Sequence, residues 1–156
     1  MIDAALNELR QRLFDAPCFV IDFLPRQVPR ESGGRCFAVE RFLAARPQID
    51  ELYGRFARLL LKLNCYCGLA VNHPSCDEWI SDPAPQELDS LIKGCVPEDG
   101  AESLCVMFPE QETMLTLDGG DLYLALYAGT EKLLETARQL AASEGLFLRP
   151  SRTEEQ

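Results

Sequence analysis

Three short apolar segments follow one another in the second half of the chain, and they constrain its fold more than any other feature. They are "SLCVMF" (103–108), "TMLTL" (113–117) and "DLYLALY" (121–127), each separated from the next by a few residues. Short apolar runs bounded by turn residues are typical of strands. Strands with such short connections pair antiparallel, because a parallel crossover needs a dozen or more residues. The sequence therefore predicts an antiparallel meander here.

The connection "DGGD" between the second and third segments indicates a β-hairpin. Gly119 and Gly120 would form a two-residue turn, in which both central residues need a positive φ. The expected register pairs Leu117 with Leu122 and residue 115 with residue 124. The leucines of both strands then share one face of the sheet, which supports the hairpin.

Helical periodicity predicts the elements that surround this meander. After Pro47, apolar residues recur every three or four positions as far as Leu63, as on one face of an amphipathic helix. The expected helices are 2–14, 36–45, 48–63, 86–94 and 130–144, and the further expected strands are 18–24, 65–71 and 146–148. Since helices and strands alternate only in part, we expect an α+β fold, with a five- or six-stranded, mostly antiparallel sheet and helices packed on it. We expect one domain over residues 1–150 and a disordered polar tail over 151–156.

The stretch "LNCYCGLAVNHPSC" holds the densest group of reactive side chains: Cys65, Cys67, the only histidine His73, and Cys76. Structural zinc sites take four such ligands in a tetrahedron, but Cys-x-Cys without a second knuckle is a weak zinc signature. On the expected strand, the first two cysteines project from the same face and pack as small hydrophobic residues. We therefore favour buried thiols, assign no metal and no cofactor, and keep a zinc-stabilised domain as an alternative.

The sequence offers no catalytic set. A nucleophilic cysteine needs a base, and only His73 is available, with no residue placed to orient its ring. Motifs for phosphate loops, dinucleotide binding, serine hydrolases and zinc proteases are absent. We assign no catalytic residue and do not expect an enzyme, although the lack of a motif leaves that question open.

The candidate ligand-binding residues are Arg26, Arg30 and Arg35, with Asp22 in the strand just before them. The three arginines fall in an expected loop beside a pair of glycines, where backbone N–H groups and guanidinium groups suit a phosphate or a carboxylate. The commoner alternative is a solvated loop with surface ion pairs. Asp22, if buried, needs a partner, and we favour a structural ion pair over catalysis.

The net charge of −10 is unevenly distributed. Residues 1–62 carry a net charge of +2, and residues 63–156 carry −12. Nucleic-acid binding needs clustered lysine and arginine, so we expect no nucleic acid as a partner. No apolar run is long enough to cross a bilayer, so we expect no membrane either. The acidic part suits a basic protein partner or a homo-oligomer, or it serves only solubility.

The seven cysteines, an odd number, and the absence of an apolar signal segment indicate a reducing, cytoplasmic setting. We therefore expect a small cytoplasmic interaction or accessory protein, regulatory or immunity-like in kind. The alternative is a small-molecule or anion-binding domain at the arginine loop, which could be an enzyme. Trp79 lies in an acidic connection, where it either fills the core or anchors an interface.

Overall fold

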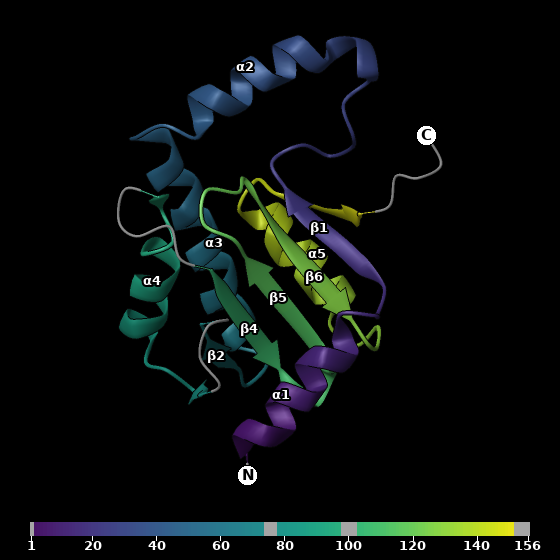
Figure 1. The fold of residues 1–156 in the computed structure, drawn as a ribbon, viewed down its shortest axis with the longest axis vertical. Coiled ribbons are helices and arrows are strands. Elements are labelled where there is room, and N and C mark those ends of the chain that lie inside the picture. Colours follow the sequence, from purple (N-terminus) through teal and green to yellow (C-terminus); the bar gives the residue numbers. More distant parts are fainter. Residues whose placement is uncertain (1, 74–77, 98–102, 152–156) are drawn as a thin grey trace.

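The computed structural model describes residues 2–73, 78–97 and 103–151. These residues include one antiparallel sheet of seven strands (Figure 1). The strands are β1 (Cys18–Asp22), β2 (Ala70–Asn72), β3 (Ile80–Ser81), β4 (Leu104–Phe108), β5 (Thr113–Leu117), β6 (Tyr123–Ala128) and β7 (Phe147–Pro150). Their order across the sheet is β3-β2-β4-β5-β6-β1-β7, and all neighbours run antiparallel. The α+β class is confirmed, but the sheet has seven strands rather than five or six.

The strands differ from the expected ones in two places. The added strand is β3, which lies between the strand expected at 65–71 and the helix expected at 86–94, where we expected no strand. The strand expected at 65–71 begins only at Ala70, because the preceding helix runs on to Asn64 and the chain then turns. The N–H groups of Cys65 and Cys67 donate to carbonyl oxygens in the last turn of that helix. The two cysteines therefore do not share a strand face, and Cys65 is exposed while Cys67 is buried.

Three helices cover the inner face of the sheet. The helices are α1 (Ile2–Leu13), α2 (Gly33–Leu43), α3 (Gln48–Asn64), α4 (Pro85–Lys93) and α5 (Leu134–Ser143). In Figure 1, α3 and α5 lie behind the sheet and α4 lies to its left, and the apolar residues of the three helices share one core cluster with the inner side chains of the strands. The apolar stripe expected on α3 is fully buried there. None of the described helices has the length and apolar character needed to cross a membrane.

Helix α1 packs on the outer face of the sheet, over β2, β4 and β5. Its buried leucines form a second cluster with the sulfur-containing side chains of β4 and β5 and with Trp79. The indole Nε1 of Trp79 donates to Oδ1 of Asn7 on α1 at 2.8 Å. Trp79 is 8% exposed, so it fills the core between α1 and the sheet.

The β5–β6 hairpin differs from the expected two-residue turn. Leu115 pairs with Leu126, a register shifted by two residues from the expected one, and of the two glycines only Gly120 has a positive φ, 92°. A shift of two residues leaves every side chain on its face. The leucines therefore still point to the inner core, while Thr116 and Tyr123 share the outer face.

A buried hydroxyl group holds the longer hairpin loop. The Oη atom of Tyr53, on α3, donates to the carbonyl oxygen of Asp121 at 2.7 Å and accepts from the N–H of Gly120 at 3.0 Å. Burial raises the pKa of the Tyr53 hydroxyl above its ordinary value, so the group stays protonated and keeps donating. The loop is thus shaped by a residue about 67 positions earlier in the chain.

The substitution Tyr53→Phe tests this contact. We expect it to lower the free energy of unfolding by about 1–2 kcal/mol, because two backbone groups of the hairpin loop lose their partner. Urea denaturation measures the loss. The matched control is Tyr66→Phe, since Tyr66 is 70% exposed and the change should leave stability unaltered. Equal stability of Tyr53→Phe and the unaltered protein would contradict the role given to the hydroxyl.

Candidate functional site

The outer face of the sheet is covered over only part of its width. Beyond α1, the outward side chains of β5, β6, β1 and β7 form an area that we call the open strip. It consists of Cys18, Val20, Asp22, Thr116, Tyr123, Ala125, Tyr127, Phe147 and Arg149. None of these residues is buried, whereas Ile21, Leu124 and Leu126, which point to the inner face of the same strands, are at most 1% exposed. The strip is therefore a sheet face without a helix.

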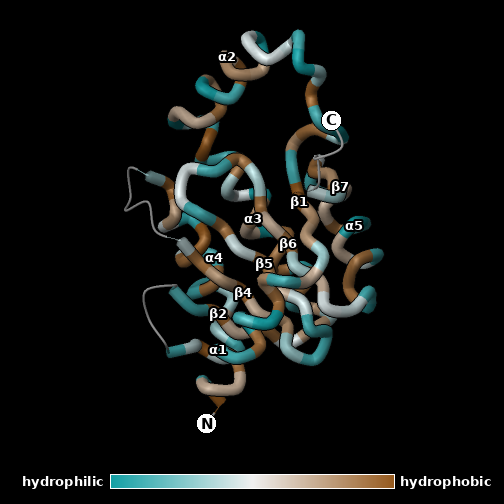
Figure 2. The backbone as a smooth tube through the Cα atoms, turned by 45° about the vertical axis from the view of Figure 1, so that its right-hand side comes forward, coloured by the Kyte–Doolittle hydropathy of each residue, from teal (hydrophilic) through white to brown (hydrophobic). Residues whose placement is uncertain are grey.

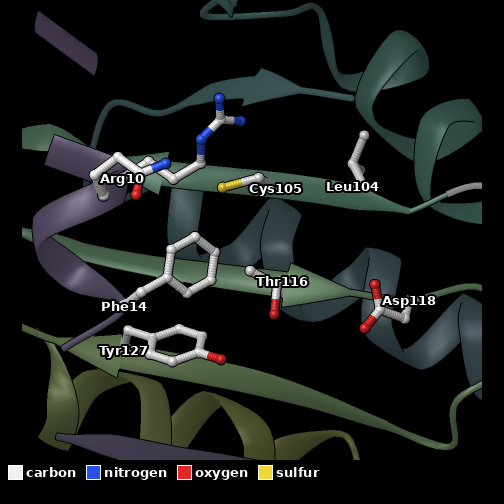
Figure 3. Close-up of a pocket in the computed structure, with 8 residues that line it drawn as sticks. Arg10, Phe14, Leu104, Cys105, Thr116, Asp118 and Tyr127 are labelled. Atoms are coloured by element: carbon white, nitrogen blue, oxygen red, sulfur yellow. The ribbon is translucent and has the colours of Figure 1, made fainter. Parts of the chain in front are cut away.

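A pocket of about 390 Å³ lies where α1 meets the open strip (Figure 3). Its lining residues are Arg10, Gln11, Phe14, Leu104, Cys105, Thr116, Asp118 and Tyr127. The rings of Phe14 and Tyr127 meet edge to face, with centroids 5.3 Å apart. At the other end, Asp118 accepts a hydrogen bond from Oγ of Ser103 at 2.8 Å. The pocket thus has an aromatic end and a carboxylate end.

Arg10 forms a wall of this pocket and turns its guanidinium group away from Phe14 and Tyr127 (Figure 3). The group donates to Oδ1 of Asn7 at 3.0 Å and to Oδ1 of Asn72, and it lies 5.2 Å from the centre of the Trp79 ring. These contacts join α1 to β2 and to the segment before β3. Arg10 therefore holds α1 on the sheet rather than presenting a charge to the pocket.

Cys105 lies on the floor of the pocket as a neutral thiol. Burial raises its pKa to about 12, and its Sγ atom donates to Sδ of Met114 at 3.7 Å. His73 belongs to a different hollow, beside Val71 and Leu91. The eight residues that line the pocket thus contain no nucleophile with a base beside it. Their chemistry suits recognition of a side chain or ligand by shape, ring contacts and one carboxylate.

The second unusual surface is an arm, residues 24–46, that carries α2 beyond the end of the sheet (Figure 1). No residue of this arm is buried. Phe37, Val39 and Phe42 on α2 are 60%, 49% and 61% exposed. Figure 2 shows this helix standing apart from the body with hydrophobic and hydrophilic residues side by side. A surface helix normally buries one apolar face against its own protein, whereas α2 has no buried residue and only its last residue, Leu43, packs against the core cluster.

A groove of about 310 Å³ separates the arm from the body of the protein. Phe37 and Arg41 line it on the side of the arm, and Asp121 and Tyr123 line it on the side of the β5–β6 hairpin. The Arg41 guanidinium lies over the Phe37 ring, 5.6 Å from its centre. Tyr123 belongs to the groove and to the open strip, so these two surfaces are continuous.

The arginines predicted as ligand-binding residues all lie on the arm. Arg26 is in the connection from β1, Arg30 begins a 3₁₀ turn, and Arg35 is in the first turn of α2. All three are exposed, and within the described part of the chain the one side-chain hydrogen bond found for them runs from Arg35 to Oγ of Ser32 at 3.0 Å. An anion site at these arginines remains a prediction.

Asp22, the fourth predicted residue, has a partner in another part of the chain. It accepts a hydrogen bond from Nη2 of Arg149 on β7 at 2.6 Å, and the two side chains are only 14% and 20% exposed. This ion pair joins the neighbouring strands β1 and β7 on the open strip. It is the structural role that we favoured for Asp22, although the sequence could not identify the partner.

The cysteine and histidine stretch is spread over several places. Cys65 is exposed at the end of α3, Cys67 is buried in the inner core, and Nδ1 of His73 lies 3.4 Å from the carbonyl oxygen of Ser103. Cys76 lies outside the described residues. Among the residues that the structure describes, no three of His, Cys, Asp and Glu are grouped so that they could hold a metal. The zinc-stabilised domain, which counts Cys76 among its ligands, stays a prediction.

Sequence reasoning missed both surfaces, for different reasons. Phe14, Thr116 and Tyr127 come from three separate elements, and no local pattern connects them. The arm did carry a signal: the apolar residues at 36, 37, 39, 42 and 43 do not fall on one helical stripe. A short helix with apolar residues on several sides cannot bury them all on one face, and that indicates exposed apolar surface.

Comparison of the chain with protein-family models, with curated proteins and with solved structures finds no match. The open strip and the arm are therefore interpreted from their own chemistry.

The thiol of Cys105 gives a direct test of the pocket. We expect iodoacetamide at pH 8 to alkylate the exposed Cys65 readily and to leave Cys105 unmodified in the folded protein, because the Cys105 thiolate forms only near pH 12. Peptide mapping by mass spectrometry measures both. Unfolding in urea should make the two cysteines react alike, which is the control. Alkylation of native Cys105 as fast as Cys65 would contradict the neutral, unreactive thiol.

The arginine loop has its own test. An anion bound by Arg26, Arg30 and Arg35 should stabilise the protein by about 2.7 kcal/mol at 100 times its Kd. A thermal-shift series with phosphates, nucleotides and carboxylates measures this, and the triple change to glutamine should abolish the shift. The control is Arg138→Gln, an exposed arginine on α5. If no anion raises the melting temperature, the loop has no such function.

Proposed function

We propose that this protein is a protein–protein interaction module that binds an apolar segment of a partner with α2 and the open strip. The observation that carries the proposal is that Phe37, Val39 and Phe42 are 49–61% exposed on a helix with no buried residue, and that Val39 and Phe42, three positions apart, share one face of it. Contiguous exposed apolar patches with a polar rim mark interaction sites in folded proteins. Keeping such residues in water is unfavourable, and a partner removes that cost.

The side chains on these surfaces are of the kind that anchor protein interfaces. Phe37 and Phe42 on the arm, and Tyr123 and Phe147 on the strip, are aromatic and 40–61% exposed. Aromatic residues and arginine dominate the binding energy of interfaces. Arg41 is placed to contribute as well, since it already covers the Phe37 ring.

The pocket beside α1 supports the same function. Its volume of about 390 Å³ and its pair of aromatic rings suit an apolar side chain of a partner that lies along the strip. Thr116 and Tyr127 belong to the pocket and to the strip, so one bound segment could contact both. The pocket residues supply contacts and no reactive pair, which favours binding over catalysis.

Charge adds a second element to recognition. The arm carries five arginines against two glutamates, a net charge of +3, while the rest of the chain carries −13. Opposite charges on separate surfaces steer association and select the orientation of a partner. The basic protein partner expected from the acidic part of the chain is compatible with this surface and remains a prediction.

Photo-cross-linking in the cells that make the protein tests the proposal. We expect p-benzoylphenylalanine in place of Phe37 and, separately, of Tyr123 to join the chain to the same protein, which mass spectrometry identifies. The control is the same replacement at Ile2, an apolar residue 65% exposed at the far end of the molecule. No adduct at 37 and 123, or equal adducts at 2, would contradict the proposed function.

A further inference from the structure

We propose that the partner is a second copy of this chain, and that each copy places its α2 on the open strip of the other. This inference rests on the proposed function and names its partner. Each chain has one helix without a sheet to pack on and one sheet face without a helix. A twofold pairing is self-complementary, so it covers the exposed helix and the exposed sheet face of both copies at once.

The arm is held in a position from which α2 does not cover its own strip. Leu43 and Ala44, at the end of α2, pack against the inner core cluster beside the start of α3. This contact fixes one end of α2, and the helix projects beyond the end of the sheet (Figure 1). The outward residues of the strip remain only partly covered as a result. A neighbouring molecule approaching that end can meet both surfaces.

The dimensions of the two surfaces agree. Helix α2 has 11 residues, which corresponds to a length of roughly 16 Å. Strand β1 has five residues, or roughly 17 Å. One α2 can therefore lie along the strip for its full length. The strip offers small or flat side chains along its middle, with Val20 and Ala125 paired across β1 and β6, so the larger side chains of α2 have space there.

The charges of the two surfaces are complementary. Arg35 and Arg41 lie on α2, and Asp118 and Asp121 lie beside the strip, at the hairpin loop. Burial and the nearby Asp118 carboxylate raise the pKa of Asp121 above its ordinary value. A guanidinium group from a second copy would relieve that repulsion between carboxylates. Because arm and body carry opposite net charges, a twofold pairing brings unlike charges together twice.

The apolar area is sufficient for a stable dimer. Five large apolar residues are 40–61% exposed on the two surfaces: Phe37, Val39, Phe42, Tyr123 and Phe147. A half-exposed side chain of this size offers roughly 100 Å². Val39 and Phe42 share one face of α2, so these two residues with Tyr123 and Phe147 bury about 800 Å² over two copies. The half-buried strip residues and the rim bring the total into the range of about 1,200–2,000 Å² that specific interfaces bury.

Light scattering during size-exclusion chromatography gives the first test. We expect the purified chain to have twice its mass of 17.5 kDa and the double variant Phe37→Ser, Phe42→Ser to have the single mass. Neither side chain is buried in the single chain, so the variant body should stay folded, with unchanged fluorescence of the buried Trp79. The control Ile2→Ser should remain a dimer, because Ile2 lies at the opposite end of the molecule (Figure 1).

Mixing two damaged chains tests which surfaces meet. Ala125→Glu puts a charge in the middle of the strip and should also give a single-mass protein. An equimolar mixture of Ala125→Glu with the α2 double variant should form a heterodimer. Its Kd should be at least tenfold lower than that of the homodimer of either variant. In that heterodimer the Ala125→Glu chain supplies an intact α2 and the double variant supplies an intact strip, so one of the two contacts is complete. A dimer formed by contact between two α2 helices would not be restored.

Three outcomes overturn the inference: a single mass for the unaltered chain at every concentration, a dimer that survives both sets of changes, or a mixture that fails to associate. The first outcome would still leave the proposed function intact if cross-links from positions 37 and 123 reach a different protein. If those cross-links are also absent, the inference and the proposed function are both contradicted.

Discussion

An antiparallel sheet has two faces that must be shielded from water, and this chain shields one of them fully and the other only in part. The inner face meets α3, α4 and α5 in a single core cluster. Helix α3 is central to that cluster, with nine buried residues, and its Tyr53 also fixes the loop between β5 and β6. Of the described residues, those of α1 and Trp79 cover the outer face. The remaining features of the molecule follow from this uneven coverage.

The contacts of α1 determine where the coverage stops. Arg10 joins α1 to Asn72 on β2 and stacks over Trp79, which is itself bonded to Asn7. This network places α1 over the side of the sheet that holds β2, β4 and β5. Beyond it, the strands β6, β1 and β7 present partly exposed side chains, with Asp22 and Arg149 neutralising each other among them. Such a pair is compatible with a covered surface, because neither charge is left without a partner.

The features that local periodicity controls could be predicted from the sequence. The stripe of α3 and the three meander segments appear where the spacing of apolar residues placed them. The α+β class followed from them. The strand expected at 65–71 was wrong because "CYCGLAV" is apolar throughout, and an apolar run alone does not distinguish a strand from the turn that ends a buried helix.

Features that depend on distant contacts could not be predicted. The hairpin register depends on Tyr53, and the partner of Asp22 lies 127 residues away in Arg149. The pocket needs Phe14 and Tyr127 to meet, and no spacing in the sequence brings them together. The arm is an intermediate case, since its composition showed apolar residues on several sides of a short helix but not that the helix would leave the body.

The central claim is that α2 is stabilised by another molecule rather than by its own chain. Isolated helices of this length are only marginally stable in water, so the amide groups of residues 33–43 should exchange quickly in a single chain. Hydrogen–deuterium exchange at increasing protein concentration measures this most directly. The account predicts that protection of residues 33–43 rises with concentration while that of α3 stays constant. Protection of α2 that is the same at every concentration would contradict it.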